Sequence, residues 1–160
     1  MPGAEHAYVD LHFGGEGEDL RVDVDAPYWD DPAPSAAPGS CPGLFEFEVV
    51  ELFLLGADDR YLEIELGPHG HHLVLELHGR RRPVREGLPI AYRAEITADR
   101  WRGRAHVPRD YCPPGLRALN AYTIRGRSPR RYAAHRAVPG DGPDFHRLEH
   151  FAPFASGGDV

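Results

Sequence analysis

The sequence predicts an all-β protein, an antiparallel β-sandwich or a β-barrel with long loops rich in proline and glycine. Apolar and polar residues alternate with a period of two in several segments, which is the pattern of a strand with one buried face. The chain also holds 18 Gly and 16 Pro among its 160 residues, which is enough to separate many short strands by turns. The sequence contains no convincing amphipathic helix, and residues 108–111 form its one plausible helical turn. This pattern therefore favours the all-β class.

Length and composition indicate one domain spanning residues 1–160. A chain of this length can bury a core of its own, and 41% hydrophobic and 27% charged residues are ordinary for a globular protein. No apolar run approaches the roughly 18 to 20 residues that cross a bilayer, and the first residues lack the cationic and apolar regions of a signal peptide. We therefore expect a cytoplasmic protein with no membrane partner, in which Cys41 and Cys112 are free thiols.

The first strand and the first loop are clear in the sequence. Residues 20–25 alternate strictly between apolar and polar, which predicts a strand. Residues 26–43 follow with five Pro and two Gly and predict a long surface loop. Long loops in compact domains are often functional, and this one carries the aromatic pair Tyr28 and Trp29.

The middle of the chain predicts a meander of three antiparallel strands. Residues 45–55 and 60–66 form a hairpin, and residues 71–78 follow after a second turn. The segment 144–151 is rich in aromatic residues and is expected to dock on the body, whereas residues 155–160 are expected to form a disordered tail. Weaker strand signals cover residues 89–97, 100–107, 119–125 and 131–138.

Charge is strongly segregated along the chain. Residues 1–79 carry 2 Arg against 17 Asp and Glu, whereas residues 80–160 carry 16 Arg against 8 Asp and Glu. The two halves are therefore expected to attract each other. Because the net charge is −7, nucleic acid is not expected as a partner.

Acidic side chains gather on the predicted hairpin. Period-two geometry puts Glu46 and Glu48 on one face of its first strand, and Glu63 and Glu65 on one face of its second strand. These four carboxylates either line one cleft or form the solvent face of the hairpin. Glu51 departs from the parity of Glu46 and Glu48 and lies among apolar residues, where a carboxylate needs a partner. Glu51 is therefore the most informative acid in the sequence.

Histidines concentrate at the turn before residues 71–78. His69 and His71 are spaced so that one strand can aim both imidazoles at a metal ion, and with Glu76 they match part of the first cupin motif. Glu63 and Pro83 stand where that motif has glycines, and no second cupin motif follows. The alternative is a turn of exposed or hydrogen-bonded histidines without a metal.

Two stretches near the C-terminus complete the set of candidates. Arg125 ends a predicted central strand, where it can pair with an acid such as Glu51 or bind an oxyanion of a ligand. His146 and Glu149 lie among aromatic residues, so His146 is expected inside the fold. The sequence has no Gly-rich phosphate loop, no Gly-x-Ser-x-Gly elbow and no Cys-x-x-Cys pair. Nucleotide-dependent, serine-hydrolase and thioredoxin-like classes are therefore excluded.

Several motifs resemble the family-9 carbohydrate-binding modules and the related DOMON-like β-sandwiches. They are the Glu-containing strand at residues 46–54, the Tyr-x-Glu strand at 61–66, the Pro-x-Gly turn at 68–70 and the Asn-x(4)-Arg strand at 120–125. More closely, residues 26–154 resemble a family of small uncharacterised proteins found in animals and bacteria. The shared runs include Glu48-Val49-Val50-Glu51, Pro68-His69-Gly70 and Pro143-Asp144-Phe145-His146. The resemblance implies a jelly-roll-like β-sandwich.

The resemblance also changes the candidate metal ligands. His69 and His72 belong to the shared motif, whereas His71 does not. It therefore implies that a metal, if bound, is held by His69, His72 and His146, with Glu149 beside them.

Sugar binding would use other residues. Sugar-binding members of the broader family stack aromatic side chains on pyranose faces and bind hydroxyl groups with carboxylates, amides and arginines. The resemblance assigns these roles to Tyr28, Trp29, Glu48 and Arg125. Trp101 is instead expected in the core, because its neighbours alternate. The resemblance also raises a calcium site at Asp30 and Asp31.

These observations lead to three functional hypotheses. The first is non-catalytic binding of a small polar ligand, with a carbohydrate as the best candidate, in a cleft walled by residues 28–31 and the hairpin acids. Its ligand-binding residues are Tyr28, Trp29, Glu48, Glu51, Glu63 and Arg125. The second is a metal-dependent or acid–base enzyme in which His69, His72, His146 and Glu149 converge. The third is a structural or partner-binding role. The ligand, the metal (calcium or a transition metal) and the oligomeric state stay open.

Overall fold

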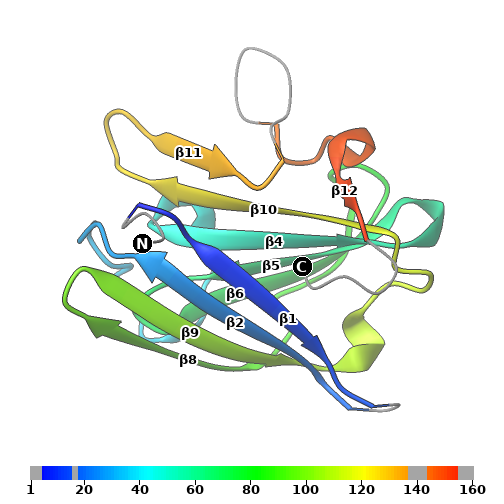
Figure 1. The fold of residues 1–160 in the computed structure, drawn as a ribbon, viewed down its shortest axis with the longest axis horizontal. Helices are drawn as coiled ribbons and strands as arrows, with labels where there is room; N and C mark the ends of the chain where they lie inside the picture. Colours follow the sequence, from blue (N-terminus) through cyan, green and yellow to red (C-terminus); the bar gives the residue numbers. More distant parts are fainter. Residues whose placement is uncertain (1–4, 16–17, 137–143, 155–160) are drawn as a thin grey trace.

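The computed structural model describes residues 5–15, 18–136 and 144–154, and over these residues the protein is all-β (Figure 1). The strands are β1 (Tyr8–Phe13), β2 (Leu20–Pro27), β3 (Gly39–Ser40), β4 (Val49–Leu55), β5 (Arg60–Leu66), β6 (His71–His78), β7 (Pro83–Glu86), β8 (Ala91–Thr97), β9 (Arg100–Val107), β10 (Ala118–Arg125), β11 (Arg131–Ala134) and β12 (Ala152–Pro153). Short 3-10 helices lie between them: η1 (Leu44–Glu46), η2 (Ala57–Asp59), η3 (Arg109–Tyr111) and η4 (Leu148–His150). Within the described ranges, no helix is long and apolar enough to span a membrane. The all-β prediction is confirmed.

The strands form two sheets that pack face to face as a β-sandwich (Figure 1). The smaller sheet has the order β1-β2-β9-β8. The larger sheet has the order β11-β10-β4-β5-β6-β3, with β12 beside β10 and β7 beside β6. Strands of the smaller sheet cross those of the larger sheet obliquely, as twisted sheets do when they pack. The strand spacing left a β-sandwich and a β-barrel open, and the structure is the β-sandwich.

The larger sheet buries apolar residues on both of its faces. On the inner face, β4 and β5 contribute Leu52, Leu54, Leu62 and Ile64 to the core between the sheets. On the outer face, Phe53, Leu55, Tyr61 and Leu77 form a second cluster, which Phe151 of the C-terminal segment covers. The expected docking of residues 144–151 is therefore observed. The outer face beyond this cover is where the candidate site lies.

The predicted meander is present as β4, β5 and β6, but its first strand starts later than predicted. The sequence predicts a strand from residue 45, whereas β4 begins at Val49 because the preceding residues form η1. Gly43 enters this turn with φ of 76°, a left-handed conformation that favours glycine. Glu46 and Glu48 both precede β4, so the prediction that they share a strand face is wrong.

Most of the other strand predictions correspond to observed elements. The segments 20–25, 89–97, 100–107, 119–125 and 131–138 correspond to β2, β8, β9, β10 and β11. The predicted loop 26–43 is present from residue 28 onward, because β2 extends to Pro27, and it contains the short strand β3. The sequence did not predict β1, β3, β7 or β12. The expected tail at residues 155–160 and the end of the last predicted segment, residues 137–138, lie outside the described residues.

Candidate functional site

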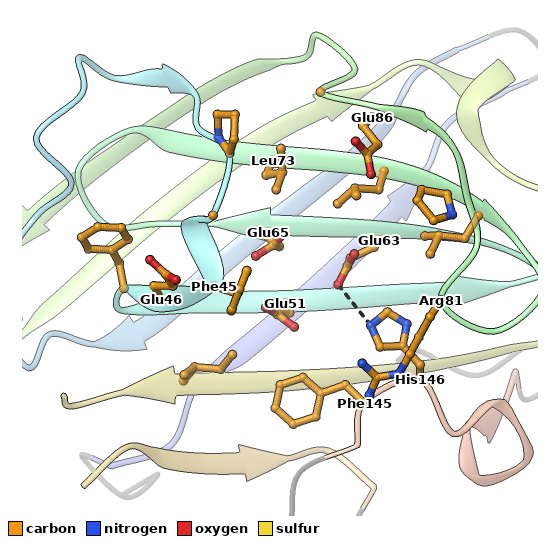
Figure 2. Close-up of a pocket in the computed structure, with 18 of the residues that line it drawn as sticks. Phe45, Glu46, Glu51, Glu63, Glu65, Leu73, Arg81, Glu86, Phe145 and His146 are labelled. Atoms are coloured by element: carbon orange, nitrogen blue, oxygen red, sulfur yellow. Dashed lines mark ion pairs between the residues drawn. The ribbon is translucent and has the colours of Figure 1, made fainter. Parts of the chain in front are cut away.

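A cavity of about 1170 Å³ opens on the outer face of the larger sheet (Figure 2). Its floor consists of side chains from β4, β5, β6 and β10. Its walls come from η1, from the turn between β10 and β11, and from the segment around His146. The lining combines carboxyl groups, guanidinium groups and aromatic rings, so the cavity has both polar and flat apolar surfaces.

Three glutamates meet at the floor of this cavity. Glu51 of β4 lies directly opposite Glu65 of β5, and Glu63 lies two residues from Glu65 on the same face of β5. Their exposed fractions are only 2% for Glu51, 8% for Glu63 and 2% for Glu65. One carboxylate oxygen of each lies within 4.8 Å of the other two, and Figure 2 shows the side chains projecting into one space. The alternative in which the hairpin acids form a solvent face is therefore wrong for these residues.

Burial and mutual repulsion keep protons on these carboxyl groups. Burial, reinforced by the charge of Glu65, raises the pKa of Glu63 to about 8. Burial raises the pKa of Glu65 to about 7, although a hydrogen bond from Glu51 opposes the rise. Burial, with the charges of Glu65 and Glu63, raises the pKa of Glu51 well above its usual value. The cluster therefore keeps protons on its carboxyl groups at pH values at which an exposed glutamate is ionised.

His146 lines the cavity beside Glu63. Its Nε2 atom lies 4.0 Å from Oε1 of Glu63 (Figure 2), and its Nδ1 atom lies 2.7 Å from the hydroxyl oxygen of Tyr61. The same hydroxyl accepts a hydrogen bond of 2.9 Å from the backbone N–H of Arg81. Burial, with the charge of Arg81, lowers the pKa of His146 to about 4. The imidazole is therefore neutral at neutral pH, and it lies largely inside the fold, where the sequence predicts it.

Aromatic and arginine side chains form the rim of the cavity. Phe45 and Tyr132 line it and remain 54% and 45% exposed. Phe145 stacks on Tyr122 with ring centroids 3.8 Å apart, which fixes its orientation. Arg130 donates hydrogen bonds to nearby backbone carbonyls, which holds its guanidinium group in place. The rim thus offers flat rings and an ordered cation beside the carboxyl floor.

The loop that was predicted to wall the cleft lies away from this cavity. The carboxylate of Glu48 accepts hydrogen bonds from the backbone N–H groups of Trp29 (2.9 Å) and Asp31 (3.2 Å). Burial raises the pKa of Glu48, and these two hydrogen bonds oppose that rise. Neither Tyr28, Trp29 nor Glu48 belongs to the described residues that line the cavity. The expected wall is therefore replaced by η1 and its neighbours, because Glu48 fixes the loop instead of facing the cavity.

Replacing Glu48 with alanine is expected to destabilise the protein by about 2 to 3 kcal/mol, because two backbone N–H groups lose a charged acceptor at a buried site. Urea unfolding followed by circular dichroism measures this change. Glu46→Ala is the matched control, because Glu46 is exposed, and it should change the free energy of unfolding by no more than about 0.5 kcal/mol. Equal effects of the two substitutions would contradict the anchoring role of Glu48.

Arg125 does not face the carboxyl cluster. Its guanidinium carbon lies 4.4 Å from the centroid of the Trp29 ring, which is a cation–π contact. Ile124 lines the cavity, so the next side chain along β10 leaves the sheet on the other face. The predicted pairing of Arg125 with Glu51 is therefore wrong.

The two loop aspartates are engaged within the fold. Asp30 accepts a hydrogen bond of 2.9 Å from the Tyr28 hydroxyl, and Asp31 accepts one of 2.6 Å from the backbone N–H of Gly126. Neither belongs to a group of described side chains close enough to share an ion. The geometry therefore gives no support to a calcium site at Asp30 and Asp31.

The candidate histidines are distributed over different parts of the sandwich. His69 contacts Tyr28 with ring centroids 5.8 Å apart, and His72 contacts Tyr92 at 6.0 Å. His146 lines the cavity instead. In the described part of the chain, the group of His, Cys, Asp and Glu side chains close enough to hold a metal is the glutamate cluster, which contains none of these histidines.

Glu149 lies on the surface. It forms ion pairs with Arg80 (2.6 Å) and Arg147 (2.8 Å), and hydrogen bonding to Arg147 is the largest cause that lowers its pKa to about 2. The enzyme hypothesis required His69, His72, His146 and Glu149 to converge, and the structure does not bring them together.

The sequence places Glu63 and Glu65 on one face of their strand, but it does not bring Glu51 beside them. The pairing register, in which Glu65 stands opposite Glu51, is the signal that brings them together. That register follows from the length of the turn between β4 and β5. The rim residues Phe45 and Tyr132 carried no comparable signal, because an aromatic residue in a strand pattern is usually in the core.

Comparison with known proteins places the chain in a family. No family model matches it. A protein of Danio rerio is 40% identical over 160 residues, covering 94% of this chain and 81% of that protein. A mouse protein is 42% identical over 146 residues (85% and 76%), and a human protein is 39% identical over 160 residues (94% and 79%). Each is named UPF0462 protein C4orf33 or its homologue. This chain belongs to the UPF0462 family.

The fold of this UPF0462 chain has a counterpart among solved structures. A crystal structure of a candidate carbohydrate-binding protein from Bacteroides uniformis superposes with a TM-score of 0.69. The match covers 93% of this chain and 85% of that chain, with 13% sequence identity. At this identity the likeness shows the fold of the UPF0462 chain alone.

Proposed function

We propose that this protein binds a small polar ligand of the carbohydrate class in the cavity on the outer face of the larger sheet, without covalent chemistry. The observation that carries this proposal is the combination of an aromatic rim and a carboxyl floor in one cavity of about 1170 Å³. Small-molecule sites are commonly concave, with apolar walls and a few convergent polar groups. The fold likeness to the Bacteroides uniformis protein supports the carbohydrate class.

The lining suits the chemistry of a sugar. A protonated carboxyl group such as that of Glu63 both donates and accepts hydrogen bonds, and the guanidinium group of Arg81 donates them, so hydroxyl groups find both kinds of partner. The exposed rings of Phe45 and Tyr132 offer flat apolar surfaces for the C–H face of a pyranose. In this proposal the cavity takes the place of the loop 28–31 as the binding surface.

Tyr132→Ala is expected to weaken binding of a sugar at least about tenfold, because it removes an aromatic platform worth about 1.4 kcal/mol. A panel of monosaccharides and disaccharides is screened by saturation-transfer NMR, and calorimetry then gives the Kd of each hit. Tyr8→Ala is the matched control, because Tyr8 is 42% exposed on β1 and does not line the cavity. Equal loss in both variants, or no hit with the unmodified protein, would count against the proposal.

A second candidate function is acid–base catalysis on the same ligand. The pairing of Glu63, whose pKa is raised to about 8 by burial, with the neutral His146 at 4.0 Å favours it. The same NMR samples distinguish the two functions after prolonged incubation. New product signals that vanish in Glu63→Gln would favour catalysis, whereas unchanged ligand spectra favour binding.

A further inference from the structure

We infer that Glu51, Glu63 and Glu65 form a binding site for a hard divalent cation at the floor of the cavity. The three side chains come from adjacent strands and meet on one face, with one oxygen of each within 4.8 Å of the others. These oxygen–oxygen distances fit three ligands of one ion, because two oxygen atoms that each bind Ca²⁺ at about 2.3 to 2.6 Å lie no more than about 5 Å apart. This inference is independent of the sugar proposal.

The pairing register places two like charges where they repel. Glu51 and Glu65 are directly opposite each other on neighbouring strands, a position at which like charges destabilise a sheet. The surrounding floor is apolar, with Leu73, Leu75 and Ile124 beside the acids. Three carboxyl groups at such a place need a counter-charge to be ionised together.

The described part of the fold supplies little of that counter-charge. Within it, no arginine or histidine forms an ion pair with Glu51 or Glu65, and Glu63 has only His146, at 4.0 Å. The charges of Arg130 and Arg81 lower the pKa values of Glu51 and Glu63, but Arg130 donates to backbone carbonyls and Arg81 forms its ion pair with Asp144. The three carboxyl groups therefore lack a paired arginine, and the cavity leaves space for a cation above them.

An independent observation points from this cluster to a ligand. The Oε1 atom of Glu65 is buried and has no hydrogen-bond partner, although the side chain lines the cavity and is only 2% exposed. A buried oxygen without a partner costs free energy, which a bound cation would recover. This atom gives the ion its first ligand, and Glu51 and Glu63 give the others.

The donor set defines the class of ion. All three ligands are carboxylate oxygens, which suit Ca²⁺, Mg²⁺ and Mn²⁺, whereas Zn²⁺ and copper ions prefer sites with nitrogen or sulfur. Three protein ligands leave the remaining positions of the ion open toward the cavity. Water or hydroxyl groups of a bound molecule would fill them.

The test uses the full chain after treatment with a chelator. Mn²⁺ is titrated into the protein, and electron paramagnetic resonance measures the concentration of free Mn²⁺. Calorimetry then measures the binding of Ca²⁺ and of Mg²⁺, and each of these ions is also added as a competitor of bound Mn²⁺. We expect one Mn²⁺ per chain and at least about tenfold weaker binding in Glu65→Gln. The competition ranks the three ions, because Mg²⁺ demands a tighter octahedral site than Ca²⁺. Glu46→Gln, which lines the same cavity outside the cluster, should bind like the unmodified protein.

Circular dichroism shows whether each variant is folded before its binding is compared. Should Glu65→Gln not fold, Glu51→Gln tests the same site. Absence of uptake of all three ions by the unmodified protein overturns the site, as does undiminished uptake by a folded variant of the cluster. Because the metal alone is the probe, this result does not depend on whether a sugar binds.

Discussion

The free energy of unfolding is expected to fall as the pH rises from about 5 to 8 in the presence of a chelator, by about 3 kcal/mol from Glu63 alone. In the folded protein, burial raises the pKa of Glu63 to about 8 and that of Glu65 to about 7, whereas their ordinary value is 4.5. Between these values the folded protein holds protons that the unfolded chain has released. Raising the pH therefore favours unfolding. Urea titrations at several pH values across this interval measure the slope.

Other titrating groups around the cluster change the shape of this curve. His146 has the opposite effect on the free energy of unfolding. Its pKa is lowered from 6.5 to about 4, so the stability that the neutral imidazole contributes is lost as the pH falls below 6.5. The decline with pH is therefore steepest above about pH 6.5. The charges of Arg81 and Arg130 oppose the raised pKa values of Glu63 and Glu51, but burial is the larger effect for both acids.

The matched variants isolate the cause of this pH dependence. Glu63→Gln should be more stable than the unmodified protein at about pH 8 and should show a flatter profile, because glutamine carries no proton to lose. Glu46→Gln should give a profile parallel to that of the unmodified protein, since this side chain is exposed. Stability that is constant or rising over this interval, with Glu63→Gln parallel to the unmodified protein, would contradict protonated carboxyl groups in the cluster.

The fold could be predicted from the sequence where alternation was strict. Residues 20–25 and 62–66 alternate without a break and lie in β2 and β5. The start of β4 could not be predicted this way, because the segment from Phe45 to Glu48 also alternates although it contains a 3-10 helix. Gly43 in a left-handed conformation decides that geometry, and alternation does not report backbone turns of this kind.

The candidate site could be predicted only in part. A carboxylate such as Glu51 on an apolar face signals a need for a partner, and the sequence identified it for that reason. Its partners turned out to be further acids, since the register sets Glu65 and not Arg125 beside it. A period-two pattern says which residues share a face, but the sequence does not say which strands are neighbours. The histidines were misjudged for the same reason, because His69 and His146 are brought to different regions by strand order.

Trp101→Ala is expected to lower the free energy of unfolding by about 3 to 5 kcal/mol, because Trp101 is 1% exposed and fills the core between the two sheets. Its ring is packed so closely that a Cβ on Gly103 would lie 3.1 Å from it. Urea unfolding followed by far-ultraviolet circular dichroism measures the loss, since the substitution removes one of the two tryptophans that would report unfolding by fluorescence.

Trp29→Ala is the matched control for this substitution. Trp29 is half-buried in the loop and its ring forms a cation–π contact with Arg125, so its removal should cost only about 1 kcal/mol. Both variants delete the same side chain, and only Trp101 joins the smaller sheet to the larger. If Trp29→Ala were as destabilising as Trp101→Ala, the loop would be part of the core. A small effect would leave the inter-sheet core as the platform that holds β4 and β5, and with them the three glutamates, in place.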